Sequence, residues 1–344
     1  MQFASRNALL RCTLYLAVMM TAAAFFWRMP GRSFRGTPPA LTANEAAVQT
    51  VVQRHVRVLA GEIGERNAIC STALRQAADY IVSNFTDMGY APVRMPYTIG
   101  AMAFDNIVAE HRGVTHPKHI LVVGAHYDSV VGTPGADDNA TGVAGLIALA
   151  QSCARRRFSQ TIRFVAFVNE EPPFYHTSDM GSLVYARACR ARGETLRAML
   201  CLEMLGYYSN ASHSQLFPEG LGWLLGRLFP RQGNFIAFTG NARSIRLLHR
   251  CIRTFRRTAT VPSEGAVLPE SLSGLSDNWS FWQIGVPALM VTDTAMFRNP
   301  HYHGADDTIA TLDFESMTRV IIGLDAVIDE LAGVVASDVD VEPL

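Results

Sequence analysis

Histidine and acidic side chains repeatedly follow short apolar stretches of this chain. The first stretch is followed by His126 and Asp128, the second by Glu170 and Glu171, and the third by Glu203. Imidazole nitrogens and carboxylate oxygens bind zinc and similar divalent ions, and a positioned carboxylate can also act as a general base. The pattern therefore predicts a hydrolytic metal site at the ends of successive strands.

Two further segments carry the same residue types. Asp137 and Asp138 lie just before a predicted helix, and residues 301–308 include His303 and Asp307. Each segment alone is common in turns and helix caps. Two histidines and four or more carboxylates at one sheet edge, however, would repel one another unless cations neutralised them. We therefore interpret the set as a metal centre.

Strands that alternate with helices must position these side chains. This alternation predicts an α/β fold with three layers, α/β/α, around a mostly parallel mixed sheet. Ligands of such sheets bind at the carboxyl ends of the strands, which is where we expect the metal site. The predicted strands are 120–123, 162–168, 198–202 and 288–292, and the predicted helices are 44–59, 71–88, 142–156, 181–191 and 311–335.

The composition excludes several classes of protein. The 344 residues include 30 Lys and Arg and 30 Asp and Glu, so the formal net charge is zero. This balance argues against a nucleic-acid partner bound by bulk positive charge. The six cysteines form no Cys-x-x-Cys pair, which argues against a thiolate zinc site or a dithiol redox centre. A chain of this length can bury a large hydrophobic core without disulfide bonds or structural metal ions.

The N-terminus predicts export or membrane anchoring. Residues 12–27 carry no charge, Arg6 and Arg11 precede them, and three aromatic residues end the run. We favour an uncleaved signal anchor, with a cleaved signal peptide as the alternative, and both place the main domain on the extracytoplasmic side. The expected division is a signal anchor or signal peptide in 1–28, a linker in 29–43, the main domain in 44–336 and an acidic tail in 337–344.

The ordered motifs between residues 50 and 335 resemble those of a known enzyme family. GAHYDS, PGADDNATG, NEE, a strand that ends in an acid, and HxxxDT occur here in the order typical of co-catalytic zinc exopeptidases. That family includes secreted bacterial aminopeptidases, with glutamate carboxypeptidase and glutaminyl cyclase as more distant relatives. The resemblance implies a zinc-dependent metallo-exopeptidase, preferably an aminopeptidase, that acts on peptide substrates.

The resemblance also implies a role for each residue. Two zinc ions would share Asp138, the residue just before the Asn-x-Thr-Gly segment, rather than Asp137. Glu170 would be the general base for a metal-bridging water, and Asp128 the carboxylate that orients a metal-bound histidine. The implied ligands are His126, Asp138 and Glu203 for one ion and Asp138, Glu171 and His303 for the other.

Two details bear on this assignment. The spacing to Asp307 and Thr308 favours His303 over His301 as a ligand. Most aminopeptidases of the family have Asp where this chain has Glu203, which leaves the occupancy of the first metal site open. The alternatives are a glutaminyl cyclase-like acyltransferase with a single zinc ion, a carboxypeptidase of the same fold, and a non-catalytic receptor-like domain that has lost its metals.

Overall fold

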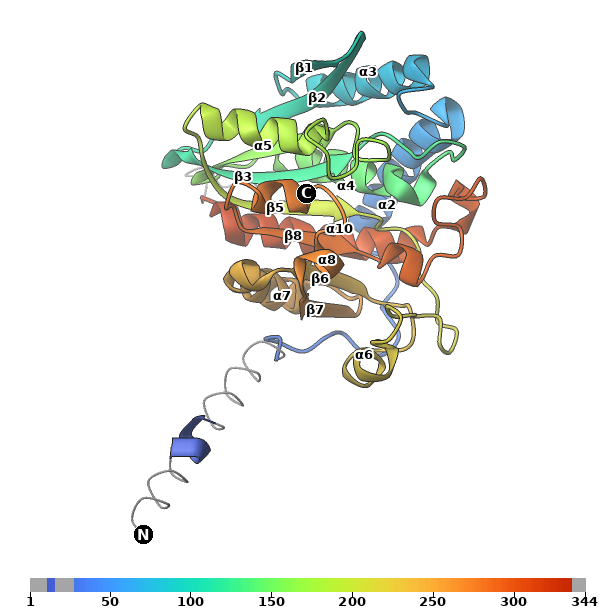
Figure 1. Ribbon diagram of the computed structural model, residues 1–344, viewed down its shortest axis with the longest axis vertical. Helices are drawn as coiled ribbons and strands as arrows, with labels where there is room; N and C mark the ends of the chain where they lie inside the picture. Colours follow the sequence, from blue (N-terminus) through green and yellow to red (C-terminus); the bar gives the residue numbers. More distant parts are fainter. Residues whose placement is uncertain (1–10, 16–27, 336–344) are drawn as a thin grey trace.

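An eight-stranded mixed sheet runs through the part of the chain that our computed structural model describes, residues 11–15 and 28–335 (Figure 1). The strand order is β1-β2-β4-β3-β5-β8-β6-β7. The four central strands β4, β3, β5 and β8 are parallel, while β2 and β6 run against them at either side. The strands are β1 Val93–Ile99, β2 Met102–His111, β3 His116–His126, β4 Gln160–Phe167, β5 Thr195–Glu203, β6 Ile236–Gly240, β7 Ser263–Val267 and β8 Ala288–Thr292.

Both faces of the central strands are apolar, and alternate residues of each strand enter different cores. In β3, Leu121, Val123 and Ala125 belong to one core, whereas Ile120 and Val122 belong to the other. Side chains alternate between the two faces along a strand, so an unbroken apolar run is required when both faces are covered. For this reason the central strands appear in the sequence as continuous hydrophobic stretches.

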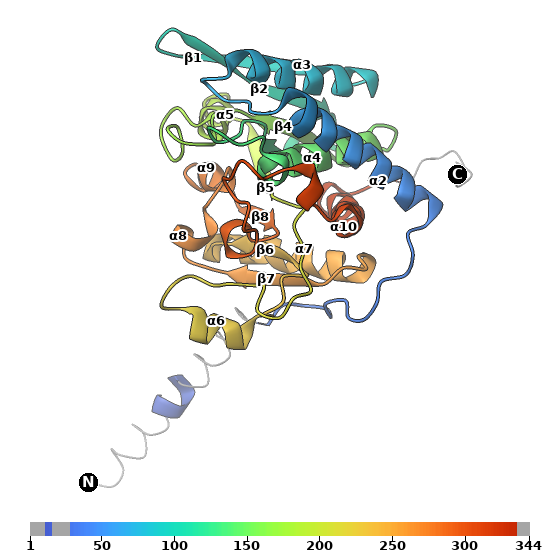
Figure 2. The ribbon, with the colours of Figure 1, turned by 90° about the vertical axis from the view of Figure 1, so that its right-hand side faces the viewer.

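Helices cover the two faces unequally (Figure 2). The larger core packs five helices against one face, and the smaller core packs α5 and α9 against the other, where α8 also lies. The first group is α2 Ala43–Val56, α3 Ser71–Asp87, α4 Gly142–Cys153, α7 Ile245–Thr258 and α10 Phe314–Ala332, and the second is α5 Gly181–Ala191, α8 Glu270–Ser273 and α9 Asn278–Trp282. The predicted three-layer arrangement is confirmed.

The remaining helical segments lie in loops. Helix α6, Gly222–Leu228, lies near the end of the sheet that carries β6 and β7 (Figures 1 and 2). The short helical turns are η1 Arg57–Ile63 and η2 Ala136–Thr141, which are π-helical, and η3 Ala242–Ser244, η4 Ala295–Phe297 and η5 Ile309–Thr311, which are 3-10 helices.

The stretch before α2 has no regular secondary structure but lies along the domain. The side chain of Ser33 accepts a hydrogen bond from the backbone N–H of Ser263 in β7, at 2.8 Å, and Arg256 of α7 donates to the carbonyl of Pro30. No helix among residues 11–15 and 28–335 is long and apolar enough to cross a membrane. Most of the anchor predicted for residues 12–27 lies outside the described residues.

Gly124 of β3 tests how tightly the central strands pack. A Cβ at this position would lie 2.4 Å from Cε2 of Phe167, so we expect Gly124→Ala to lower the free energy of unfolding by about 1–3 kcal/mol through overpacking. Chemical denaturation measures this change. The control is Gly222→Ala in α6, where a Cβ meets no atom within 4 Å and the change should stay within about 0.5 kcal/mol. Equal losses in both variants would contradict the packing described here.

Candidate metal centre

The carboxyl ends of three adjacent parallel strands bring most of the predicted residues together. β3 ends at His126 and β5 ends at Glu203. β4 ends at Phe167, opposite His126 in the register, and the chain continues from there to Glu170 and Glu171. Because the strands are parallel neighbours, their final side chains reach one edge of the sheet.

Two loops supply the other predicted residues. Asp138 lies in η2, the turn before α4, and His303 lies in the loop after β8. The carboxylate of Asp307 accepts the backbone N–H of Asp137 at 2.9 Å and that of Asp138 at 3.1 Å. Since Asp307 follows His303 by four residues, this one carboxylate ties the two loops to each other.

Asp138 lies between the two histidines. Its Oδ1 is 3.2 Å from Nε2 of His126, and its Oδ2 is 3.1 Å from Nε2 of His303. On the first side, Nε2 of His126 is also 3.3 Å from Oε2 of Glu203. On the second side, Nε2 of His303 is 3.5 Å from Oε2 of Glu171. The residues thus form two groups that share one carboxylate.

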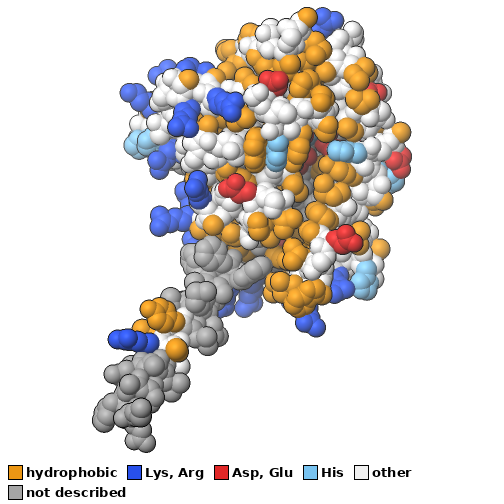
Figure 3. Space-filling model, in the orientation of Figure 1, with side chains coloured by type: hydrophobic (Ala, Val, Ile, Leu, Met, Phe, Trp, Pro, Cys, Tyr) orange, Lys and Arg blue, Asp and Glu red, His pale blue; other side chains and the backbone are white. Residues whose placement is uncertain are grey.

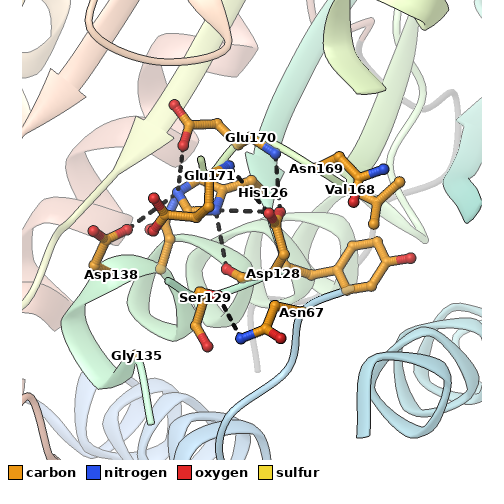
Figure 4. Close-up of polar contacts among 12 residues, drawn as sticks. Asn67, His126, Asp128, Ser129, Gly135, Asp138, Val168, Asn169, Glu170 and Glu171 are labelled. Carbon is orange, nitrogen blue, oxygen red and sulfur yellow. Dashed lines mark hydrogen bonds and ion pairs between the residues drawn. The ribbon is translucent and has the colours of Figure 1, made fainter. Parts of the chain in front are cut away.

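Glu170 lies beside these groups without joining their short contacts. Its Oε2 is 4.0 Å from Nε2 of His126. Figure 4 shows the carboxylates of Glu170 and Glu171 lying apart, with Asp138 next to that of Glu171. Adjacent acids therefore present their carboxylates to different parts of the same site.

Asp128 supports the site in two ways. Its backbone carbonyl lies 3.1 Å from Nδ1 of His126, closer than its own carboxylate, which lies at 3.6 Å. The carboxylate instead accepts the backbone N–H groups of Glu170, at 3.2 Å, and Glu171, at 3.1 Å (Figure 4). The residue therefore positions both the histidine and the pair of acids that follow β4.

The acids of the site are almost completely buried. The exposed fraction is 3% for Asp138, 5% for Glu170, 4% for Glu171 and 8% for Glu203. Burial raises the pKa of Glu170 and Glu171 well above the ordinary value, and repulsion from neighbouring carboxylates raises it further. Burial also raises the pKa of Glu203. The protein alone therefore does not favour full ionisation of all four groups.

The two histidines offset part of the cost of burying ionised carboxylates. Burial acts to lower the pKa of His126, but the charges of Glu203 and Glu170 outweigh it and hold that pKa well above its ordinary value. Burial acts to raise the pKa of Asp138, yet the imidazoles of His126 and His303 beside its two oxygens lower it. Positive charge in this cavity is therefore strongly favoured.

The backbone turns sharply at three points of the site. Asn169 precedes Glu170 and has a φ of 60°, Met204 follows Glu203 with a φ of 54°, and His303 itself has a φ of 58°. A left-handed backbone at a residue other than glycine costs on the order of 1–3 kcal/mol and persists where the surroundings impose it. These turns aim the side chains at a common point.

Arg66 is a structural residue that the sequence interpretation missed. It is completely buried, and it donates to the carbonyl oxygens of Tyr127 at 2.8 Å, Gly135 at 2.7 Å and Gly64 at 3.0 Å. Burial lowers its pKa to about 10. Arg66 thus links Tyr127, directly after β3, to Gly135, shortly before Asp138. It lies in an irregular segment, so the sequence pattern gave no indication of this role.

Other candidate residues lie apart from the centre. Nδ1 of His301 is 2.6 Å from Oδ2 of the exposed Asp306. Asp137 faces away from the two histidines, since its Oδ1 accepts the N–H of Gly206 at 2.9 Å and its Oδ2 accepts the side-chain amide of Asn299 at 2.8 Å. Neither residue joins the two groups around Asp138.

The donor set fits zinc. Zinc holds nitrogen and oxygen ligands at about 2.0–2.2 Å, so two ligands of a tetrahedral ion lie about 3.3 Å apart. The four nitrogen–oxygen distances around Asp138 run from 3.1 to 3.5 Å. Among the described residues, Asp138 Oδ1 and Glu171 Oε1 are also buried without a hydrogen-bond partner. These orphaned oxygens and the spacing suit a divalent cation.

A mostly apolar pocket opens beside this centre. Glu203 and Tyr302, the neighbour of His303, line its inner end. Its floor is formed by side chains of β8, β6 and β7, and side chains from residues 215–229 and 295–297 form its other walls. Hydrophobic side chains also gather on the outer surface over α6 (Figure 3). The pocket was missed at the sequence level because β6, β7 and α6 were not predicted.

Comparison with known families and proteins gives a consistent picture. The family described as Peptidase family M28 matches residues 106–325, a range that includes all the residues of the centre. The Escherichia coli (strain K12) protein named Uncharacterized protein YfbL is 33% identical over 284 residues, which are 79% of this chain and 85% of that protein. A Probable leucine aminopeptidase of Trichophyton verrucosum (strain HKI 0517) is 30% identical over 226 residues, 62% of this chain and 53% of that protein. The chain spans about half the length of the leucine aminopeptidases that it matches.

Solved structures share the fold. BSAP, a zinc aminopeptidase from Bacillus subtilis, aligns with a TM-score of 0.65 at 14% identity, covering 82% of this chain and 95% of that chain. Glutaminyl cyclase of Porphyromonas gingivalis aligns with a TM-score of 0.61 at 19% identity, covering 83% and 98%. At these identities the likeness establishes the fold.

Two neighbouring histidines provide a matched test of the metal centre. His303→Ala should lower zinc affinity by more than the roughly 10–100-fold that follows loss of a residue that only supports a ligand. His301→Ala should leave zinc affinity unchanged, because His301 pairs with Asp306. Zinc content after dialysis and calorimetric titration of the metal-free protein measure both effects. Equal zinc affinity in the two variants would rule out a ligand role for His303.

Proposed function

The chain belongs to peptidase family M28, and from this premise we propose that it is a zinc-dependent aminopeptidase, which removes N-terminal residues from peptides. The observation that carries the proposal is the position of Asp138, with one oxygen 3.2 Å from His126 and the other 3.1 Å from His303. A carboxylate with an imidazole on each side could serve as a ligand shared by two divalent ions.

We assign the ligands accordingly. His126 and Glu203 would complete one zinc site around Asp138, and Glu171 and His303 would complete the other. The extra length of Glu203, compared with an aspartate, is accommodated by two hydrogen bonds to its Oε2, from Ser276 Oγ at 2.6 Å and from the Asn139 amide at 3.1 Å. These bonds support a fixed orientation of Glu203 toward His126.

Glu170 is the proposed general base. Zinc bound by these residues would polarise the scissile carbonyl and lower the pKa of a water molecule. Glu170 would take the proton of the attacking water and deliver it to the leaving amine. Its carboxylate lies 4.0 Å from Nε2 of His126, and the carboxylate of Asp128 accepts its backbone N–H. We assign Asp128 the positioning of both Glu170 and His126.

The apolar pocket supports an exopeptidase that holds one side chain next to the scissile bond. It begins at Glu203 and Tyr302, so a residue bound at the zinc ligands can direct its side chain into it. The alternatives are a single-zinc cyclase of N-terminal glutamine and a carboxypeptidase. Zinc stoichiometry, together with substrates that carry a free amino end, a free carboxyl end or an N-terminal glutamine, separates the three activities.

Replacement of the two adjacent acids tests their different roles. Glu170→Gln should leave two zinc ions bound while turnover falls by about 10²–10⁴-fold, because the amide cannot accept a proton. Glu171→Gln should instead lower zinc content, because it removes a ligand oxygen. Metal analysis and steady-state kinetics on the same preparations give both readouts. The reverse pattern, with zinc lost from Glu170→Gln, would exchange the two assignments.

We propose in addition that residues 12–27 tether the main domain, residues 44–336, to a membrane on the extracytoplasmic side. Two sequence features support the tether: the absence of charge in 12–27 and the three aromatic residues that end this run, as at a membrane interface. The contacts of Pro30 and Ser33 with α7 and β7 would then hold that end of the domain near the membrane.

Cell fractionation tests the tether. A C-terminally tagged chain should sediment with membranes, and protease added outside intact cells or spheroplasts should digest the domain. Replacing residues 12–27 by a cleavable signal peptide should release an active enzyme from the membrane. Recovery of the unaltered chain in the soluble extracytoplasmic fraction would indicate a cleaved signal, and a domain protected in the cytosol would contradict both arrangements.

A further inference from the structure

A single row of residues crosses the sheet from the metal centre to the far end of the apolar pocket. Glu203 of β5 is paired with Thr292 of β8, Thr292 with Ala237 of β6, and Ala237 with Glu264 of β7. All four residues line the pocket. Neighbouring strands lie about 4.8 Å apart, so the Cα atoms of Glu203 and Glu264 are about 14 Å apart.

Small side chains lie between the two glutamates. Thr292 and Ala237 occupy the row itself, and Thr239 and Ala266 occupy the adjoining register positions of β6 and β7. These four residues all line the pocket, which is walled by larger apolar side chains such as Leu225 and Phe297. The floor is therefore a trough, open at the metal centre and ending at a carboxylate.

Glu264 is not fully neutralised within the protein. Its side chain is 24% exposed, and its Oε2 lies 3.4 Å from Nη2 of Arg256, at the long end of the hydrogen-bond range. Arg256 makes a shorter bond, 2.8 Å, to the backbone carbonyl of Ser263. Burial raises the pKa of Glu264, although the charges of Arg256 and Arg35 act against this. A further cation in the pocket would stabilise the carboxylate.

We propose that Glu264 recognises the cationic end of an N-terminal lysine or arginine side chain, whose aliphatic stem lies along the trough. This inference rests on the proposed aminopeptidase function and names its substrate class. A lysine side chain extends about 6 Å from Cα to Nζ, and a hydrogen bond adds about 3 Å, so the cation of a residue bound beside the Glu203 carboxylate can span most of the distance along the row toward Glu264. A leucine side chain would leave the outer half of the trough empty and the carboxylate without its partner.

Charge-matched substrates test the proposal. Fluorogenic amides of lysine, arginine, methionine and leucine are compared on the zinc-loaded full-length protein, methionine being an unbranched and uncharged counterpart of lysine. We expect kcat/KM to be at least about tenfold higher for lysine and arginine than for methionine, a discrimination typical of a buried charge that requires its partner. Glu264→Gln should remove that preference by lowering the values for lysine and arginine, with methionine and leucine changed less than about threefold.

Two variants serve as controls. Glu270→Gln removes an exposed acid of α8 that does not line the pocket, and it should alter none of the four values. Glu264→Asp keeps the charge beside Arg256 but withdraws the carboxylate by one methylene, so lysine should lose more than the longer arginine. Glu264→Asp decides the question if Glu264→Gln proves unstable.

Binding gives a readout that is independent of turnover. Calorimetric titration of the zinc-loaded protein with free L-lysine and L-norleucine should show tighter binding of lysine, and the difference should disappear in Glu264→Gln. A wild-type enzyme that prefers methionine or leucine, or a Glu264→Gln variant that loses all four substrates equally, would overturn the role of Glu264. Absence of hydrolysis of every aminoacyl substrate would instead reject the proposed function.

Discussion

Mutual repulsion among buried carboxylates is the constraint that governs the catalytic edge of this sheet. The fold divides its acids into two kinds. Asp128 and Asp307 each accept two backbone N–H groups, so their carboxylates have hydrogen-bond donors within the protein. Asp138 and Glu171 each keep a buried oxygen without a hydrogen-bond partner among the described residues. Asp128 and Asp307 therefore hold the loops in place. The unpaired oxygens of Asp138 and Glu171 would be stabilised by a bound cation, as expected of metal ligands.

The loops that carry these residues are held by charges placed outside the centre. Arg66 donates to the carbonyl oxygens of Tyr127 and Gly135, at the two ends of that segment. Asp307 links the turn of Asp138 to the loop of His303. Neither interaction uses a side chain of the ligand groups. The backbone therefore holds the geometry around Asp138, and this arrangement would leave the carboxylates of the proposed ligands free to bind metal.

The structural features predicted from the sequence depend on residues that are close together along the chain. The four central strands are continuous apolar runs because both of their faces are buried, and the acids follow directly at their ends. The outer strands β1, β2, β6 and β7, two on each side of the central four, were missed. In β1, β2 and β7, polar or charged residues leave only short apolar runs. Arg66 and Glu264 were missed for a different reason. Their significance depends on partners distant in sequence and on the register of the sheet, which a single sequence does not display.

The two halves of the sheet contribute to function in different ways. The parallel strands β3, β4 and β5 bring His126, Glu170 and Glu203, the proposed ligands and general base, together at their carboxyl ends. Beyond β8 the direction reverses, so β6 and β7 cannot bring their carboxyl ends to the same edge. Their side chains form part of the pocket floor instead. Cross-strand pairing continues from Glu203 through Thr292 of β8 to Ala237 of β6, so this floor lies next to Glu203 although the strand direction reverses. The reversal of strand direction thus separates the groups that break the bond from the floor along which a substrate side chain can lie.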